Sequence, residues 1–286
     1  MKFVGFGLAM FLLIASVVIA QEKKDQVSTQ SFYEQGHQLV MQAKFKEAIT
    51  YFDKALAIDS TYLVAWCYKG KALIYLEHWS EAVSIFSSAL RLNNNCIYAL
   101  GFKAYALVKL GKKKDAETLF EQAVRIQPKE KDAFAYLGRG NAYFLQGKYD
   151  LAIKDYTSTI KIDPQYAEAY YDRGNAYARQ GKYDLAIVDC NSALKINPQF
   201  VWAYAIRALA YDNQGKYDLA IADNTQALKI NPQNAGAYNN RGNTYAQNND
   251  YKSARKDWEK ALELDPNGSA GQKARQNLQR LHDLGY

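Results

Sequence analysis

Apolar and small residues recur at helical spacing within a block of 34 residues, 167–200. Tyr170, Gly174 and Tyr177 follow an i, i+4, i+7 pattern, which places them on one face of a first helix. A second helix is indicated by four further positions: Ala186, Cys190, Ala193 and Leu194. Gly181 lies between the two patterns, and glycine readily adopts the positive φ of a turn that ends a helix. The block therefore predicts a helical hairpin.

The same block occurs seven times, and we number these repeats one to seven. Their ranges are 29–62, 63–96, 97–130, 133–166, 167–200, 201–234 and 235–268. One hairpin of this length cannot bury its apolar face alone, whereas stacked neighbours can. Residues 269–286 follow, with Ala274, Leu278 and Leu281 on one side and polar residues on the others. We therefore expect an all-α fold of stacked hairpins, closed by a capping helix.

The tyrosine, glycine, alanine and proline positions of these blocks resemble the tetratricopeptide repeat (TPR) family. In repeat five they are Gly174, Tyr177, Gly181, Ala186 and Pro198. The resemblance extends from Thr29 to Gly268. It implies a right-handed α-solenoid of seven helix-turn-helix repeats. In this family the first helix of each repeat lines a concave groove that binds peptides.

The N-terminal segment, Met1–Ala20, has one basic residue, Lys2, followed by apolar and small residues up to Ala20. This pattern predicts a secretory signal peptide cleaved after Ala20, and hence a periplasmic or secreted protein. The alternative is an uncleaved membrane anchor, because the apolar stretch reaches the lower limit for spanning a bilayer. The polar segment 21–28 is expected to be a short disordered linker.

Arginine and aspartate recur together in repeats four to seven. The arginines are Arg139, Arg173, Arg207 and Arg241, and the aspartates are Asp155, Asp189, Asp223 and Asp257. Repeats one to three have neither residue at the equivalent positions, which hold Gln35, Lys69, Lys103, Tyr51, Ile85 and Leu119. Pairing within one repeat leaves no residue over, whereas pairing with the preceding repeat leaves Asp257 alone. We therefore predict four intra-repeat ion pairs with a structural role, in the bidentate geometry that Arg and carboxylate allow.

The resemblance also implies which side chains face the groove. They are Tyr33, His37, Lys71, Tyr75, Tyr98, Tyr105, Phe134, Asn141, Tyr171, Asn175, Arg179, Trp202, Asn213, Asn239 and Asn243. Aromatic side chains offer a large contact area, and amides suit the backbone of an extended peptide. The asparagines at 141, 175 and 243 are also what the family's general pattern places there, so they indicate no particular ligand.

The carboxylate clamp of TPR co-chaperones is absent from this sequence. That clamp uses a lysine at a position that holds Tyr33, Leu137 and Tyr171 in repeats one, four and five. The basic pair expected two repeats later is also missing. The sequence therefore disfavours a cytosolic adaptor for Hsp70 or Hsp90.

Motifs of enzyme and metal sites are missing as well. The three histidines, His37, His78 and His282, lie in separate segments, and no HExxH, CxxC, GxSxG or P-loop pattern occurs. We expect neither an enzyme nor a cofactor. The odd number of cysteines, Cys67, Cys96 and Cys190, leaves at least one without an intramolecular partner, and a disulfide between the first two remains open.

The net charge of +7 comes from basic residues spread along the repeats, with Lys112–Lys114 as the single run. Spread charge is typical of solvated faces, so nucleic acid is not expected as a partner. The sequence thus predicts a non-catalytic, extracytoplasmic scaffold that binds peptides or proteins in its groove. The alternative is a membrane-anchored assembly factor or co-chaperone that retains residues 1–20; a secreted enzyme or nucleic-acid binder is less well supported.

Overall fold

The computed structural model describes residues 2–283 and 285, without the side chains of residues 2–20 and 22. Within these residues the chain forms helices and no strand. By its contacts the chain divides into two units. The first unit comprises Met1–Val40 and Phe45–Asn94, and the second comprises Met41–Lys44 and Asn95–Tyr286. The boundary after Asn94 lies near the end of repeat two, in the turn between α4 and α5.

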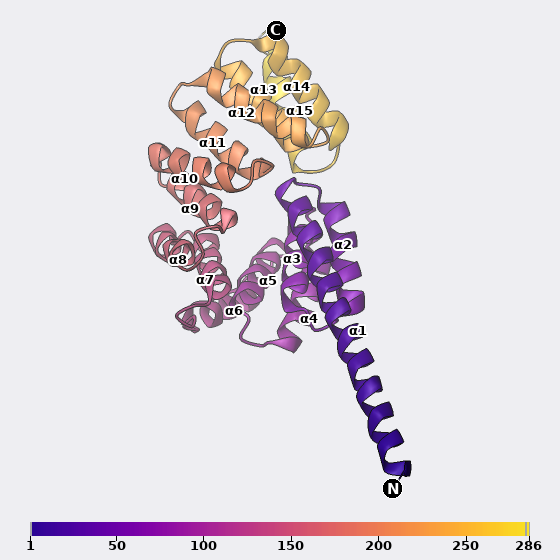
Figure 1. Ribbon diagram of the computed structural model, residues 1–286. Helices are drawn as coiled ribbons and strands as arrows, with labels where there is room; N and C mark the ends of the chain where they lie inside the picture. Colours follow the sequence, from indigo (N-terminus) through magenta and orange to yellow (C-terminus); the bar gives the residue numbers. More distant parts are fainter. Residues whose placement is uncertain (1, 284, 286) are drawn as a thin grey trace. The chain divides into compact units, whose positions relative to one another are not determined.

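The first unit contains four helices. They are α1 (Lys2–Met41), α2 (Phe45–Ile58), α3 (Leu63–Tyr75) and α4 (Trp79–Leu92) (Figure 1). Helix α3 packs against both α2 and α4. Phe52 and Phe86, both fully buried, lie on the faces of α2 and α4 that the apolar spacing predicts.

The second unit contains the remaining eleven helices. They are α5 (Ile97–Lys109), α6 (Lys113–Arg125), α7 (Ala133–Leu145), α8 (Tyr149–Ile162), α9 (Ala167–Arg179), α10 (Tyr183–Ile196), α11 (Val201–Asn213), α12 (Tyr217–Ile230), α13 (Ala235–Gln247), α14 (Tyr251–Leu264) and α15 (Ser269–Asp283) (Figure 1). Each hairpin packs its two helices together, and each hairpin contacts the next. Helix α15 packs on α14 and α13 and buries Ala274 and Leu281, as a terminal cap does.

The turn inside each hairpin requires a left-handed residue at one fixed position. Glycine occupies it in repeats three to six: Gly111, Gly147, Gly181 and Gly215 have φ between 71° and 78°. The same position in repeats one, two and seven holds Ala43, Glu77 and Asn249, with φ between 56° and 61°. Glycine adopts this region without steric cost, whereas Ala and Glu do not. The turn geometry is therefore common to all repeats, although the residue that best suits it is not.

A glycine in the first helix faces a large side chain of the second helix. A Cβ atom added to Gly140 would lie 2.6 Å from the ring of Tyr156, and one added to Gly242 would lie 2.8 Å from Trp258. In repeat five the partner is the smaller Cys190, and the added atom would have 3.3 Å to its nearest neighbours. The glycines thus allow the two helices of a hairpin to approach closely around a bulky core residue.

Residues 21–28 differ from the expected disordered linker, because α1 runs through them to Met41 without a break. The segment contains no glycine or proline, and its Gln, Glu and Lys residues are good helix formers. The prediction of a signal peptide or anchor depends on the side chains of Met1–Ala20, which lie outside the described part, and so stays a prediction. Among the helical segments whose side chains are described, none has both the length and the apolar character needed to cross a membrane.

Candidate functional site

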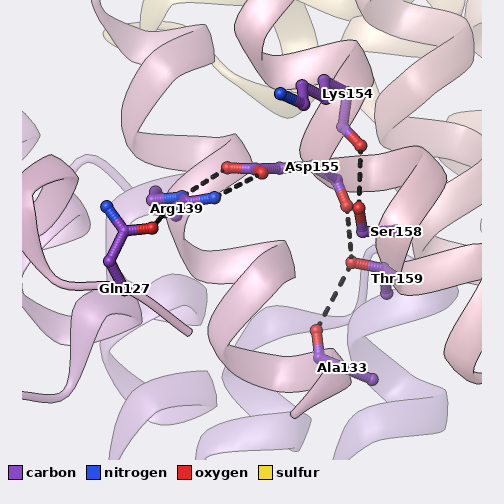
Figure 2. A network of polar contacts seen from close by, with 7 residues as sticks. All are labelled: Gln127, Ala133, Arg139, Lys154, Asp155, Ser158 and Thr159. Carbon is purple, nitrogen blue, oxygen red and sulfur yellow. Dashed lines mark hydrogen bonds and ion pairs between the residues drawn. The ribbon is translucent and has the colours of Figure 1, made fainter. Parts of the chain in front are cut away.

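The arginines and aspartates of repeats four to seven form four bidentate ion pairs. In each pair Nε donates to Oδ2 and Nη2 donates to Oδ1, over 2.6–2.8 Å. Figure 2 shows the pair between Arg139 of α7 and Asp155 of α8. The aspartate side chains are only 3–7 % exposed, so the guanidinium supplies their main compensation for burial. The hydrogen bonds to the carboxylates in turn raise the pKa of each arginine above its usual value.

The third nitrogen of each arginine reaches the preceding repeat. Nη1 of Arg173 donates to Thr157 Oγ1 over 3.0 Å, and Nη1 of Arg139 donates to Gln127 Oε1 over 2.9 Å (Figure 2). The corresponding acceptors for Arg207 and Arg241 are Asn191 and Thr225. The acceptors were not predicted from the sequence, because Thr157, Asn191 and Thr225 share one repeat position but differ in type, and Gln127 lies at another position of its repeat. Each arginine therefore joins three segments of backbone, which is a structural role rather than a ligand site.

The predicted groove residues of the first unit are largely engaged in packing. Tyr33 and His37 belong to an aromatic cluster, and the His37 ring lies 4.8 Å from that of Tyr68. Lys71 is 4 % exposed, and Tyr75 stacks on Phe45 with ring centroids 4.8 Å apart. These side chains therefore pack within the fold instead of forming the exposed peptide-binding surface that the resemblance implies.

Several aromatic groove residues of the second unit are likewise buried. Tyr98 is 1 % exposed and stacks on Phe134 at 4.8 Å. Tyr171 is 7 % exposed and packs on Phe200. Tyr105 is half-buried, with the ammonium group of Lys109 5.3 Å from its ring centroid. Burial follows from the stacking of neighbouring first helices, which a single repeat does not reveal.

Two of the predicted asparagines hydrogen-bond to core aromatic side chains, and a third is buried. The hydroxyl of Tyr156 donates to buried Asn141, and the indole Nε1 of Trp258 donates to Asn243 over 3.0 Å. Asn243 also accepts a bond from Asn277 of the capping helix. Asn239 is 4 % exposed. These amides fix core aromatics or lie buried among them, so little of their surface can contact a partner.

The accessible part of the predicted site lies on α9 and α11. Arg179 and Asn213 are exposed, and Asn175 and Trp202 are half-buried. Asn213 accepts a hydrogen bond from the Tyr183 hydroxyl over 3.0 Å. Helices α7, α9, α11 and α13 pack side by side in this order. The structure therefore brings these four side chains onto adjacent first helices of repeats five and six.

None of the three cysteines forms a disulfide within the described residues, and all three are buried. Burial strongly raises the pKa of the Cys190 thiol above its ordinary value, so the thiol stays protonated and unreactive. Among the described residues, no group of three or more His, Cys, Asp or Glu side chains is arranged to hold a metal ion.

Sequence models of TPR families match most of the repeat region. The model described as tetratricopeptide repeat matches residues 167–200, 201–234 and 235–267, and two related models match 69–131 and 140–181. The chain therefore belongs to the tetratricopeptide repeat family. A search of curated protein sequences found no match.

Solved structures with the same fold are more distant. The chain is similar to the human IFIT1 dimer with PPP-AAAA, with a TM-score of 0.66 and 17% identity, over 84% of this chain and 59% of that one. It is also similar to the APC/C hetero-tetramer Cut9–Hcn1, with a TM-score of 0.55 and 18% identity, over 85% of this chain and 54% of that one. The chain spans less than two thirds of either protein, and these likenesses concern the fold alone.

Proposed function

We propose that this protein is a non-catalytic scaffold that binds a peptide segment of a partner protein along the first helices of repeats five and six. The observation that carries the proposal is the row of packed helices α9 and α11 with Asn175, Arg179, Trp202 and Asn213 accessible on them. The Asn175 amide can both donate and accept hydrogen bonds, as the backbone of an extended peptide requires, whereas the Asn213 amide already binds Leu209 O and the Tyr183 hydroxyl. The Arg179 guanidinium forms no ion pair with another described residue, which leaves it available for a carboxylate.

The rigidity of the second unit supports this proposal. A binding surface made from several repeats keeps its shape only if the repeats cannot slide relative to one another. The arginine networks link each repeat to its neighbour, because one guanidinium binds an aspartate of its own hairpin and a Thr or Asn of the preceding one. A preorganised surface loses less conformational entropy when a peptide binds.

We place this scaffold outside the cytoplasm, with Met1–Ala20 removed as a signal peptide and no nucleic acid among its partners. The alternative, a membrane-anchored assembly factor or co-chaperone, is supported by the continuity of α1, which runs from Lys2 to Met41 without a break. Sequencing the N-terminus of the mature protein distinguishes the two. Gln21 as the first residue supports secretion, and Met1 supports the anchor.

An array of 12-residue peptides, probed with the fluorescently labelled full chain, tests the binding proposal. We expect a subset of the peptides to bind. The double variant Asn175→Ala/Arg179→Ala should lower the affinity for these peptides about tenfold or more, which is the effect of losing one charged hydrogen bond. The matched control is Gln226→Ala/Lys229→Ala, which removes an amide and a cation from exposed positions of α12. Absence of binding, or equal effects of the two double variants, would show that this surface is not the site.

A further inference from the structure

A pocket of about 530 Å³ lies in the first unit, between α2, α3 and α4. Its apolar part is lined by Ile49, Leu73, Leu76 and Ile85, and its rim includes Lys69 and Asp53. On α3 the lining positions 69, 73 and 76 follow helical spacing, whereas the predicted groove residues Lys71 and Tyr75 lie on the opposite side. The pocket is therefore a surface separate from the row of first-helix side chains.

The equivalent place in repeat five is filled by the chain itself. Leu73 corresponds to Tyr177, Leu76 to Gln180, and Lys69 to Arg173. Nε2 of Gln180 donates to Asp150 on the preceding second helix over 2.8 Å, and Arg173 donates to residues of both neighbouring second helices. Repeat two lacks the glutamine bridge, because leucine replaces both the tyrosine and the glutamine, and keeps only the bond from Lys69 to Asp53 on the preceding second helix. The loss of the tyrosine ring and of the glutamine hydrogen bond accounts for the open space.

In repeats four and seven the tyrosine at this place lies beside a cation. The guanidinium carbon of Arg139 lies 6.0 Å from the ring centroid of Tyr143, and that of Arg241 lies 5.9 Å from the ring of Tyr245. In both cases the ring comes four residues after the arginine on the same helix. Repeat two keeps the cation as Lys69, whose ammonium group lies 5.9 Å from the ring centroid of Trp66, but has Leu73 where repeats four and seven have the second ring.

We propose that this pocket binds an aromatic side chain, tyrosine or phenylalanine, of a partner polypeptide. The incoming ring would occupy the place of the tyrosine in repeats four to seven, on an apolar floor and beside the ammonium group of Lys69. The face of an aromatic ring is its negative side, so it is complementary to that cation. Lys69 is oriented by its ion pair with Asp53 and is only 18% exposed, which favours a direct contact with a bound ring.

The charge of the rim indicates what flanks the ring. Of the charged groups that line the pocket, Asp53 is paired with Lys69 and Glu81 lies 3.2 Å from Nδ1 of His78, whereas the exposed Lys46 forms no ion pair with another described residue. A carboxylate next to the aromatic residue would meet this ammonium group. The partner we infer is thus a polypeptide with an aromatic residue beside an acidic one. This inference rests on the proposed scaffold function but concerns a different surface.

N-acetyl-L-tyrosine amide, titrated into the full chain carrying labelled Ile and Leu methyl groups, tests the pocket by NMR. We expect shifts at Ile49, Leu73, Leu76 and Ile85, and weaker binding of N-acetyl-L-leucine amide. Lys69→Gln should weaken the tyrosine probe about two- to fivefold, the usual effect of one exposed cation–π contact. If a saturating concentration of the tyrosine probe leaves the NMR signals of these methyl groups unshifted, the proposal is overturned. Equal affinities for the tyrosine and leucine probes overturn it as well.

Two further variants separate occupancy of the pocket from an indirect effect. Leu73→Tyr restores the residue of repeats four to seven and should abolish binding by filling the pocket. Tyr177→Leu/Gln180→Leu opens the matching place in repeat five and should create a second binding site. If Leu73→Tyr does not fold, the gain of a site in repeat five still decides the matter, and its absence counts against the proposal. The probe is a single residue, so a negative result leaves the peptide-array test of the first-helix surface unaffected.

Discussion

Gly140 lies where α7 meets α8, directly against the ring of Tyr156. A Cβ atom at this position would be 2.6 Å from Cε1 of the ring, well inside the distance of ordinary contacts. The ring cannot readily give way, because Tyr156 is 1% exposed and its hydroxyl is held by Asn141 over 2.8 Å. At the equivalent Gly174, the added atom would meet the backbone oxygen of Ala186 and Cβ of Asp189, both at 3.3 Å. The two glycines thus differ in their surroundings but not in their helical position.

The expected magnitudes follow from two opposing effects. Replacing a helix-interior glycine by alanine stabilises the helix by about 1 kcal/mol. Forcing an extra carbon into a filled core costs about 1–3 kcal/mol. At Gly140 the displacement needed approaches 1 Å, so we take the upper part of that range. Gly140→Ala should therefore lower the free energy of unfolding by about 1–2 kcal/mol, whereas Gly174→Ala should change it by less than about 1 kcal/mol, in either direction.

Circular dichroism during urea and thermal unfolding measures both variants. In a chain of this size, about 1 kcal/mol corresponds to a shift of about 2–4 °C in Tm. Because unfolding of a long repeat array need not be two-state, the comparison uses the midpoints of the two variants against wild type under identical conditions. If Gly140→Ala is as stable as Gly174→Ala or more so, the reasoning from ring contact is wrong.

Three further variants test other features. Asp189→Ala should destabilise the protein by about 3 kcal/mol, because it leaves the mostly buried Arg173 without its carboxylate. In urea unfolding the double variant Asp189→Ala/Arg173→Ala should lose less stability than Asp189→Ala alone. A larger loss of stability in the double variant contradicts the pairing argument. Glu77→Gly should stabilise the first unit by about 1 kcal/mol, because glycine adopts the φ of 60° at this position without strain. The reverse change, Gly181→Glu, should destabilise the second unit. The midpoints of thermal unfolding measure both effects. Burial raises the pKa of Asp212 above its ordinary 3.8, so its ionisation in the folded state lowers stability as pH rises past that value. Asp212→Asn should therefore be more stable than wild type at pH 7 and equal to it well below pH 3.8, and a constant difference across this range would exclude titration as the cause.

The hairpins could be predicted from the sequence because their determinants are local. A helix face, a turn glycine and a terminal proline all recur at fixed intervals, and the first helices begin at the residues where the blocks begin, as at Ala133 and Ala167. The ion pairs could also be predicted from the sequence, because the arginine and the aspartate are both present in some repeats and both absent from the others, as Arg173 and Asp189 are both present in repeat five. The segment 21–28 is helical although its low hydrophobicity predicts disorder, because it contains no glycine or proline that would end a helix.

The candidate site could be predicted only in part. The position of Arg179 and Asn213 on exposed helix surface agrees with the family pattern, but Tyr98 and Tyr171 follow the same pattern and are buried. Whether such a side chain is exposed depends on residues that approach it only in the folded chain, such as Phe134 of the next repeat for Tyr98 and Phe200 at the end of the same repeat for Tyr171. Periodicity along one helix contains no information on that approach.

By itself the sequence determined the kind of element, its length and its repetition, since these arise from interactions within about one turn of helix or one hairpin. Only the tertiary structure decided which neighbours each side chain meets. The third hydrogen bond of each arginine, the amides that hold Tyr156 and Trp258, and the pocket beside Lys69 all depend on contacts between helices. Such contacts are set by how neighbouring repeats fill the space between them, and the pocket lies where Leu73 and Leu76 replace the tyrosine and glutamine of repeat five.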